Sequence, residues 1–355
     1  MKRYVLLLLC LALLCSLASC KQPPVQPDSS TTPPPPTIEA FPPNSVVERQ
    51  NDSYVYEIVT DEEGNSSVNI KKYIGTETKV VIPSYIDQFP VTHISKYPSE
   101  DYHSDPSLAP SAFGGTPIEE VIIPDTVLEI YHSAFYNCAR LVSVTFGKNL
   151  EWIYSSAFRE CSSLERVDLS DTKVLGISFS CFQDCTSLKE VILKEETIQI
   201  QWKAFYNCTS LEKIKLPRDL VDIFDEAFYN CKSIRELNIP KNLKGGNFMY
   251  VFNSTQLERV IVEEGREDLR FTCGPVSALP LEVIIPKSLK TFYLGAFATV
   301  QTLTLIFEGD CPSFGYGEQF SAAKTIIYYH PETEGWDDWK WGRVSNKEFI
   351  PIEQS

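Results

Sequence analysis

The chain has 355 residues, a hydrophobic fraction of 43% and a formal net charge of −15 at pH 7. This length accommodates one long solenoid or two ordinary domains, and the apolar fraction is sufficient for a sizeable core. An acidic chain without a basic stripe repels phosphate backbones, so nucleic acid is excluded as an expected partner.

The N-terminus has the layout of an export signal. A charged start (Lys2, Arg3) precedes an apolar run over residues 5–14, and a Leu-Ala-Ser-Cys sequence ends at Cys20. The run is too short to span a membrane comfortably. The Leu-Ala-Ser-Cys sequence resembles a bacterial lipobox, whose cysteine is acylated and becomes the first mature residue, although an ordinary signal peptide can end in similar small residues. We predict a lipoprotein signal peptide over residues 1–19 and lipidation at Cys20.

A proline-rich tether follows the lipidation site. Residues 20–45 combine serines and threonines with nine prolines, which are Pro23, Pro24, Pro27, Pro33, Pro34, Pro35, Pro36, Pro42 and Pro43. This composition buries no core and favours extended polyproline II, which rises about 3.1 Å per residue. A tether of this kind holds the fold up to roughly 75 Å from the membrane.

Residues 46–111 are predicted to form an N-terminal β cap and a first insert. Alternating apolar residues over 53–73 predict a hairpin. Nineteen positions separate Ile94 from Phe113, whereas later rungs use five between the same positions. Loops inserted on a rigid scaffold commonly carry recognition, and neutral drift is the competing explanation.

Residues 112–310 are dominated by an internal repeat. Five cysteines are spaced 23, 24, 23 and 23 residues apart, each three residues after a phenylalanine and three before a leucine or isoleucine. The resulting core positions are Phe135, Cys138, Leu141, Phe158, Cys161, Leu164, Phe182, Cys185, Leu188, Phe205, Cys208, Leu211, Phe228, Cys231 and Ile234. A period this regular predicts a solenoid in which each supersecondary unit packs on the next.

Each repeat also contains a short strand. Segments such as 164–169 have apolar residues at relative positions 1, 4 and 6, which predicts a strand with positions 3 and 5 facing outward. Stacked rungs place these strands side by side in a parallel sheet, about 4.8 Å apart. A phenylalanine or leucine in each rung buries about 1.5–3 kcal/mol, so neighbouring rungs stabilise one another.

The C-terminal part is predicted to depart from the repeat twice. The expected departures are a second insert at about 263–280 and an aromatic C-terminal cap over 311–355, where Trp336, Trp339 and Trp341 follow a strand-like run. Both ends of a solenoid require caps, because an open end exposes the core and a strand edge.

The in-phase Ala-Phe-x-x-Cys-x-x-Leu rungs resemble the leucine-rich repeats of the BspA-like, or treponemal, class over about residues 118–307. The resemblance implies a leucine-rich repeat solenoid at a bacterial surface, with a parallel β-sheet on its concave face, short helical or 3-10 turns on the other side, and β-rich caps. It also implies adhesion or host-protein binding, and it carries no catalytic residues.

The cysteine column is not expected to bind metal. One row of parallel thiols cannot converge on a tetrahedral ion, and adjacent rungs orient their cysteines poorly for disulfides. We interpret the five cysteines as small buried core residues with poorly reactive thiols. A bridge between Cys273 and Cys311 is left open.

No enzyme signature is present in the sequence. The four histidines lie outside any zinc or phosphate motif, and no nucleophile has a neighbouring base and orienting group. We therefore expect no catalytic residue, no metal and no cofactor.

Binding is expected to be non-enzymatic and directed at extracellular or cell-surface proteins, by a monomer whose lipid anchor attaches it to the membrane. Candidate binding residues on the inserts and the outward sheet face are Tyr97, Tyr102, His103, Lys213, Lys215, Arg259, Arg266 and Arg270. The alternative is carbohydrate binding by Trp336, Trp339 and Trp341. The expected location is a bacterial membrane, at the outer membrane or cell surface.

Overall fold

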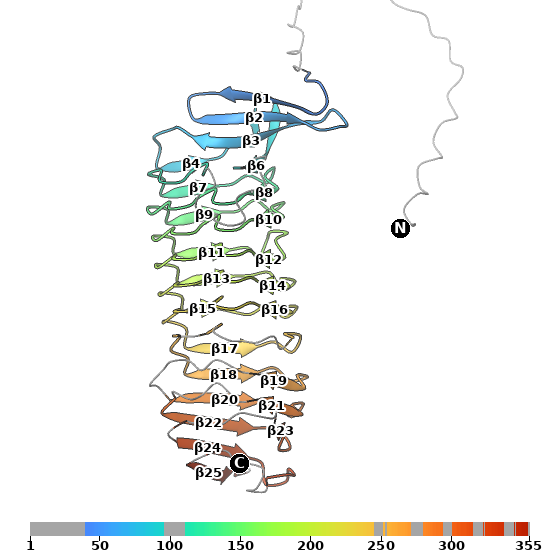
Figure 1. Cartoon of the computed structure of the whole chain (residues 1–355), viewed down its shortest axis with the longest axis vertical. Coiled ribbons are helices and arrows are strands. Elements are labelled where there is room, and N and C mark those ends of the chain that lie inside the picture. The colour runs from blue at the N-terminus through green and yellow to red at the C-terminus, as the bar shows by residue number, and fades with distance from the viewer. Residues whose placement is uncertain are drawn as a thin grey trace, which may run out of the picture. The chain divides into compact units, whose positions relative to one another are not determined.

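The computed structural model divides the chain into two units, Met1–Glu39 and Ala40–Ser355. The second unit contains the fold shown in Figure 1. The structure describes residues 40–95, 111–244, 251–252, 254–270, 280–293, 300–314, 322, 324–336, 344 and 346–353. The predicted signal peptide, Cys20 and most of the predicted tether lie outside these residues.

An antiparallel sheet starts the folded unit. It contains β1 (Ser45–Gln50), β2 (Tyr54–Thr60) and β3 (Ser66–Tyr73), and alternate side chains of β2 are buried. The hairpin expected over residues 53–73 is β2 and β3, whereas β1 was not anticipated. β3 then pairs in parallel with β6 (Phe89–Ile94), so it connects the hairpin to the solenoid.

The front sheet is parallel and consists of two pieces. The first piece contains β4 (Lys79–Val81), β7 (Glu120–Ile122), β9 (Ser143–Thr145), β11 (Arg166–Asp168), β13 (Glu190–Ile192) and β15 (Lys213–Ile214). The second piece contains β17 (Glu236–Ile239), β18 (Arg259–Val262), β20 (Leu281–Ile285), β22 (Thr302–Phe307), β24 (Lys324–Tyr329) and β25 (Lys347–Pro351).

A second column of shorter parallel strands lies beside the front sheet (Figure 1). This second sheet contains β6, β8 (Glu129–Ile130), β10 (Trp152–Ile153), β12 (Gly176–Ile177), β14 (Gln199–Ile200), β16 (Asp222–Ile223), β19 (Asp268–Arg270), β21 (Thr291–Tyr293) and β23 (Ser313–Phe314). The short strand β5 (Tyr85–Ile86) pairs antiparallel with β6.

Each rung contributes one strand to each sheet and returns through the Phe-x-x-Cys turns. Glu190, for example, pairs with Lys213 in the front sheet, and Gln199 pairs with Asp222 in the second sheet. Every position therefore stacks on the equivalent position 23 residues later. The predicted solenoid with a parallel sheet is confirmed. No residue of the described part is helical, and the connections opposite the front sheet are hydrogen-bonded turns.

The phenylalanines form a continuous stack inside the solenoid. Successive rings from Phe113 to Phe252 lie nearly parallel, with centroids 4.7, 4.9, 5.6, 5.6, 5.3 and 5.3 Å apart. All fifteen core positions expected from the repeat are fully buried. Because each aromatic pair contributes about 0.5–1.5 kcal/mol beyond burial, the stack couples neighbouring rungs.

The cysteine column has a hydrogen-bonding role. Each thiol donates to the carbonyl of the phenylalanine one rung earlier; Cys161 Sγ, for example, lies 3.2 Å from Phe135 O. Equivalent bonds are made by Cys138, Cys185, Cys208 and Cys231 at 3.1 to 3.2 Å. A buried carbonyl without a partner is costly, so the cysteine fills space and satisfies an acceptor.

The single 24-residue rung coincides with a break in the second sheet. β10 and β12 are not paired, whereas the neighbouring strands on each side are. At this break Ser178 Oγ donates to the carbonyl of Ile153. The extra residue is therefore accommodated without interrupting the phenylalanine stack.

The expected insert at 263–280 is corrected by the strand register. Arg259 of β18 pairs with Glu282 of β20, which is 23 residues later, so this segment is an ordinary rung. The expected C-terminal cap over 311–355 also contains rungs, since β24 and β25 extend the front sheet in parallel. The sequence obscures this continuity because the Phe-x-x-Cys turn is lost while the strand spacing is kept.

Candidate functional site

The front sheet is interrupted between β15 and β17. No strand pairing joins β15 to β17 in the described part of the chain, although the rungs on both sides are hydrogen-bonded. Glu212 N donates to Lys189 O at 3.0 Å on one side, and Glu258 N donates to Arg235 O at 2.8 Å on the other. Two strand edges therefore face each other without a backbone ladder.

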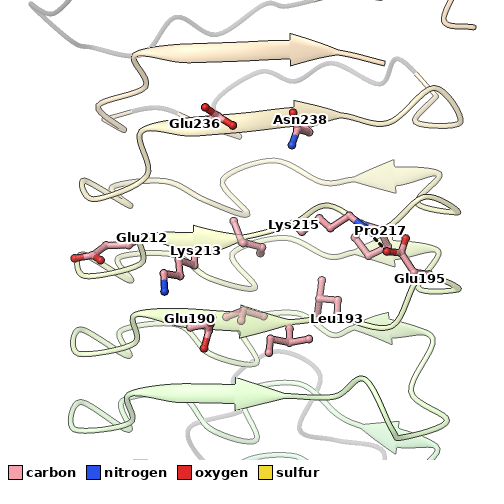
Figure 2. Close-up of a pocket in the computed structure, with 12 residues that line it drawn as sticks. Glu190, Leu193, Glu195, Glu212, Lys213, Lys215, Pro217, Glu236 and Asn238 are labelled. Atoms are coloured by element: carbon pink, nitrogen blue, oxygen red, sulfur yellow. Dashed lines mark hydrogen bonds and ion pairs between the residues drawn. The ribbon is translucent and has the colours of Figure 1, made fainter. Parts of the chain in front are cut away.

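A cleft follows this interruption across the front face (Figure 2). One cavity of about 400 Å³ lies between Glu190 on β13, Lys213 on β15 and Glu236 on β17. A second cavity of about 500 Å³ shares Lys215 and Asn238 with the first, so the two are continuous. Together they form what we call the front cleft.

The floor of the front cleft is apolar and its rim is charged. Ile192, Leu193 and Ile214 line the first cavity and are partly buried. Lys213 and Lys215, both exposed, rise on either side of Ile214. An apolar floor with charged groups at its edge is the pattern found at protein-binding sites.

Most rim charges are neutralised by the adjacent rung. Arg166 lies 2.9 Å from Glu190, and Arg259 lies 3.9 Å from Glu236 and 3.0 Å from Glu282. Lys213 differs, because it makes no ion pair with any residue that the structure describes. It is therefore the cation of the cleft most available to a partner.

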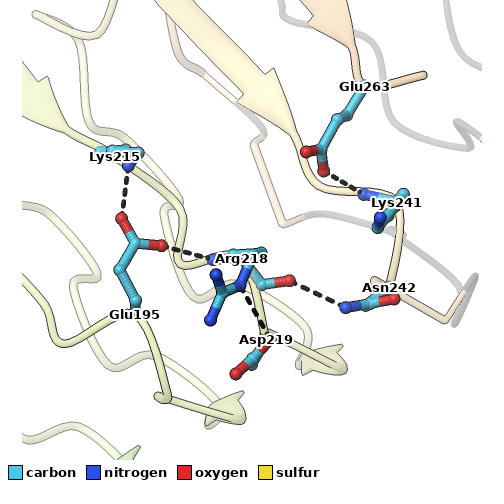
Figure 3. A network of polar contacts seen from close by, with 7 residues as sticks. All are labelled: Glu195, Lys215, Arg218, Asp219, Lys241, Asn242 and Glu263. Atoms are coloured by element: carbon cyan, nitrogen blue, oxygen red, sulfur yellow. Dashed lines mark hydrogen bonds and ion pairs between the residues drawn. The ribbon is translucent and has the colours of Figure 1, made fainter. Parts of the chain in front are cut away.

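A hydrogen-bond network supports one end of the cleft (Figure 3). The Glu195 carboxylate pairs with Lys215 and accepts the backbone amide of Arg218 at 3.0 Å. These contacts, with the Lys215 hydrogen bond first, lower the pKa of Glu195. Asn242 Nδ2 donates to Arg218 O at 3.1 Å, which links the turns on both sides of the break. Because Glu195 is held ionised, it is unsuited to act as a general acid.

Two expected binding residues lie at this site and a third lies beside it. Lys213 and Lys215 line the cleft, and Arg259 is exposed on the next strand but engaged by two glutamates. The backbone of Arg270 belongs to β19. The residues Tyr97, Tyr102, His103, Trp339 and Trp341 lie outside the described residues.

Arg266 is not a surface residue, contrary to expectation. It is 2% exposed, and its guanidinium donates to the carbonyls of Asp268 (2.6 Å), Pro240 (3.3 Å) and Leu243. Burial lowers the pKa of Arg266, and Asp268 opposes that shift. The side chain occupies the rung interior beyond the last Phe-x-x-Cys turn, so it stabilises the fold and is not accessible to a partner.

Trp336 is half-buried against the end of the described core. Its ring packs on Phe307 and Tyr329 at centroid distances of 5.0 and 5.2 Å, and its Nε1 donates to Thr333 Oγ1 at 2.7 Å. These contacts fit the packing role that the sequence analysis weighed against sugar binding.

Metal and membrane-spanning features were also examined in the described residues. No group of three or more histidine, cysteine, aspartate or glutamate side chains there is placed to hold a metal ion. No helix long and apolar enough to cross a membrane occurs among them.

The repeats match a known family. Residues 107–197 and 171–273 fit the family model of the BspA type leucine rich repeat region, in six copies. The repeat region of this chain belongs to the BspA-type leucine-rich repeat family. BspA-type repeats are non-enzymatic scaffolds, and they support a protein-interaction or adhesion-type role at the cell surface in general terms.

Several solved structures resemble the BspA-type solenoid. A leucine rich cell surface protein from Faecalibacterium prausnitzii is 19% identical over 86% of this chain and 99% of its own, with a TM-score of 0.39. The pneumococcal vaccine antigen PcpA is 17% identical over 88% of this chain and 100% of its own, with a TM-score of 0.44. The Treponema pallidum leucine rich repeat protein is 18% identical over 73% and 86%, with a TM-score of 0.36. These values are too low to carry a functional conclusion, and no curated protein matches the chain.

Proposed function

We propose that this protein is a non-enzymatic bacterial surface lipoprotein that binds an extracellular or cell-surface protein through the front cleft. The interruption of the front sheet between β15 and β17 carries the proposal. It is the place where backbone edges, an apolar floor and an available cation meet on the face that the BspA-type repeats present outward.

Unpaired strand edges favour a polypeptide as the partner. A sheet edge recognises an extended chain through main-chain hydrogen bonds, while adjacent pockets select side chains. In paired rungs the amide after the strand donates onward, as Leu169 N does to Ile192 O at 2.9 Å. The equivalent bond from Leu216 to Asn238 is not formed in the described structure, so the front cleft retains this capacity.

The charge pattern favours an acidic side chain on the partner near Lys213. The neighbouring cations Arg166 and Arg259 already contact glutamates, whereas Lys213 does not. A carboxylate entering beside Lys213 gains attraction without displacing an existing ion pair. Binding through this contact is expected to weaken as salt increases.

Lipid anchoring is the second part of the proposal and rests on the signal layout ending at Cys20. Two or more acyl chains give stable attachment, which a single chain does not. Cys20→Ala is expected to move the protein from the membrane fraction to the soluble fraction. Retention of Cys20→Ala in the membrane fraction would remove the lipid anchor from the proposal.

The binding proposal is tested with the purified full chain on an immobilised panel of host and bacterial extracellular proteins. We expect a saturable, salt-sensitive interaction that weakens about tenfold or more in the Lys213→Glu/Lys215→Glu variant, which corresponds to about 1.4 kcal/mol. The control is Lys148→Glu, which reverses an exposed charge in the turn after β9, far from the cleft.

The variants also define what would contradict the proposal. All three proteins are expected to melt at similar temperatures, because surface charge changes alter stability little. Equal binding by the cleft variant and the control would show that the partner docks elsewhere on the chain.

A further inference from the structure

A row of aromatic side chains follows the second sheet across five successive rungs. Each member lies one or two residues after the buried isoleucine of β8, β10, β12, β14 or β16. The row, here called the aromatic ridge, consists of His132, Tyr154, Phe179, Trp202 and Phe224. Because rungs stack about 4.8 Å apart, the ridge runs along the solenoid with one ring per rung.

The rings of the ridge contact one another and their aromatic neighbours. The His132 and Tyr154 centroids lie 5.2 Å apart, and those of Trp202 and Phe224 lie 4.3 Å apart. Tyr131 stacks on Tyr154 at 4.7 Å, and Trp152 lies over the same ring at 6.3 Å. Neighbouring rings therefore restrict the side-chain motion of the ridge.

Two tryptophans of this surface are strongly exposed. Trp152 is 56% exposed and Trp202 is 48% exposed, and the flanking Leu175 and Ile198 are each 46% exposed. The Phe stack fills the interior without these side chains, so core packing does not explain them. A contiguous exposed apolar patch of this kind marks an interaction surface.

Polar groups alternate with the rings. The three outward columns of this surface contain Gln199, Gln201, Glu129, Asp222 and Asp225, and neither lysine nor arginine occurs in them. Amides and carboxylates accept or donate hydrogen bonds to hydroxyl groups. Their acidity, with the net charge of −15, repels anionic ligands.

We propose that the aromatic ridge binds a neutral polysaccharide whose chain lies along the solenoid axis. The C–H face of a sugar ring packs on an aromatic face, and its hydroxyls reach the polar groups beside the ring. An extended polysaccharide repeats its ring about once per rung height, which matches the spacing of the ridge. This site is distinct from the C-terminal tryptophans and lies on the other sheet from the front cleft.

A neutral glycan fits the ridge better than a protein does. Protein hot spots lie in pockets whose surroundings exclude water, whereas Trp152 and Trp202 project from a ridge with about half of each side chain in solvent. An open row of rings with regularly placed hydrogen-bonding groups suits a repeating, hydroxyl-rich chain.

Affinity electrophoresis of the full chain tests this proposal with a soluble β-glucan, a xylan, a mannan and a dextran. Polygalacturonate provides the acidic comparison. At least one neutral polymer is expected to retard the protein, and Trp152→Ala/Trp202→Ala should weaken that retardation about tenfold or more. Tyr85→Ala is the matched control, because Tyr85 is a 60% exposed aromatic residue away from the ridge.

Each result has a defined meaning. Retardation that is lost in the tryptophan variant and kept in Tyr85→Ala and in Lys213→Glu/Lys215→Glu supports the ridge. Absence of retardation by every neutral polymer overturns it, as does retardation unchanged in the tryptophan variant or stronger with polygalacturonate. Loss of binding to a panel protein, and not to a glycan, in the tryptophan variant would assign the ridge to a protein partner instead. Single variants Trp152→Ala and Trp202→Ala, checked by melting temperature, separate a binding defect from misfolding.

Discussion

At the residue scale, each rung places two non-glycine residues in the left-handed backbone region. One precedes the phenylalanine by two positions and the other follows it by two, as Glu160 does at φ 62°. The equivalent residues in later rungs are Asp184, Asn207 and Asn230. Asn207 Nδ2 donates to Asp184 Oδ1 at 2.8 Å, and Asn230 Nδ2 donates to Asn207 Oδ1 at 2.6 Å. Asparagine therefore suits this position twice, through backbone preference and through a side-chain ladder.

Glu160→Asn is expected to stabilise the protein by about 0.5–1 kcal/mol, because asparagine tolerates the left-handed conformation and extends the amide ladder. Chemical denaturation measures the change. The reciprocal variant Asn207→Glu should destabilise by a similar amount, since it breaks the ladder on both sides. An unchanged or lowered stability of Glu160→Asn would show that neither factor limits this position.

Arg266→Ala is expected to destabilise the protein by about 2–4 kcal/mol, because three carbonyls lose their donor inside the rung. Arg259→Ala is the matched control, and its exposed ion pairs predict a change of less than about 1 kcal/mol. Denaturant midpoints compare the two. Similar midpoints for both variants would argue that Arg266 is solvated in solution.

At the element scale, the N-terminal hairpin contains two tyrosines with altered ionisation. Burial raises the pKa of Tyr54 to about 12, and burial together with a hydrogen bond to Asp87 raises the pKa of Tyr56 to about 12. The folded state therefore favours the neutral phenols. Their contribution to stability is complete below the ordinary pKa of about 10 and is lost as the pH rises through about 12.

The hairpin is accordingly expected to lose stability between about pH 10 and pH 12. Melting curves across this range should fall more steeply for the wild type than for Tyr54→Phe, which keeps the ring and removes the ionising group. Parallel decline of both proteins would place the alkaline sensitivity outside the hairpin.

The sequence predicted the rungs well wherever the Phe-x-x-Cys turn is present. Burial repeats with the same period as the letters, so the strands and core followed from spacing alone. After residue 252 the turn residues change while the strands keep their spacing, and the sequence wrongly indicated an insert at 263–280. Arg266 was misplaced for a related reason, because arginine is usually exposed and only the three surrounding carbonyls explain its burial.

The front cleft itself was only partly predictable. Lys213 and Lys215 were expected to face outward because they alternate with Ile214 and its buried neighbours. The loss of pairing between β15 and β17 has no counterpart in the spacing, which remains 23 residues from Lys213 to Glu236. The aromatic ridge did leave a signal, since an aromatic residue follows the buried isoleucine within two positions in five consecutive rungs.

At the scale of the folded unit, the phenylalanine stack and the front sheet behave differently at the break. Phe205 and Phe228 remain stacked at 5.3 Å on the rungs where the front sheet is interrupted. In a repeat protein each rung contacts chiefly its neighbours, so the stack keeps the rungs coupled there. This arrangement holds the front cleft open on a scaffold that stays continuous behind it.

The measurement that tests the central claim most directly is amide hydrogen–deuterium exchange of the full chain, alone and with the protein partner found on the panel. Alone, the amides of Leu216 and of Glu236 to Ile239 should exchange faster than the paired amide of Leu169. The partner should slow exchange across β15 and β17 and leave β20 and β22 unchanged. Unchanged exchange at β15 and β17, with protection elsewhere, would contradict the assignment of the front cleft as the binding site.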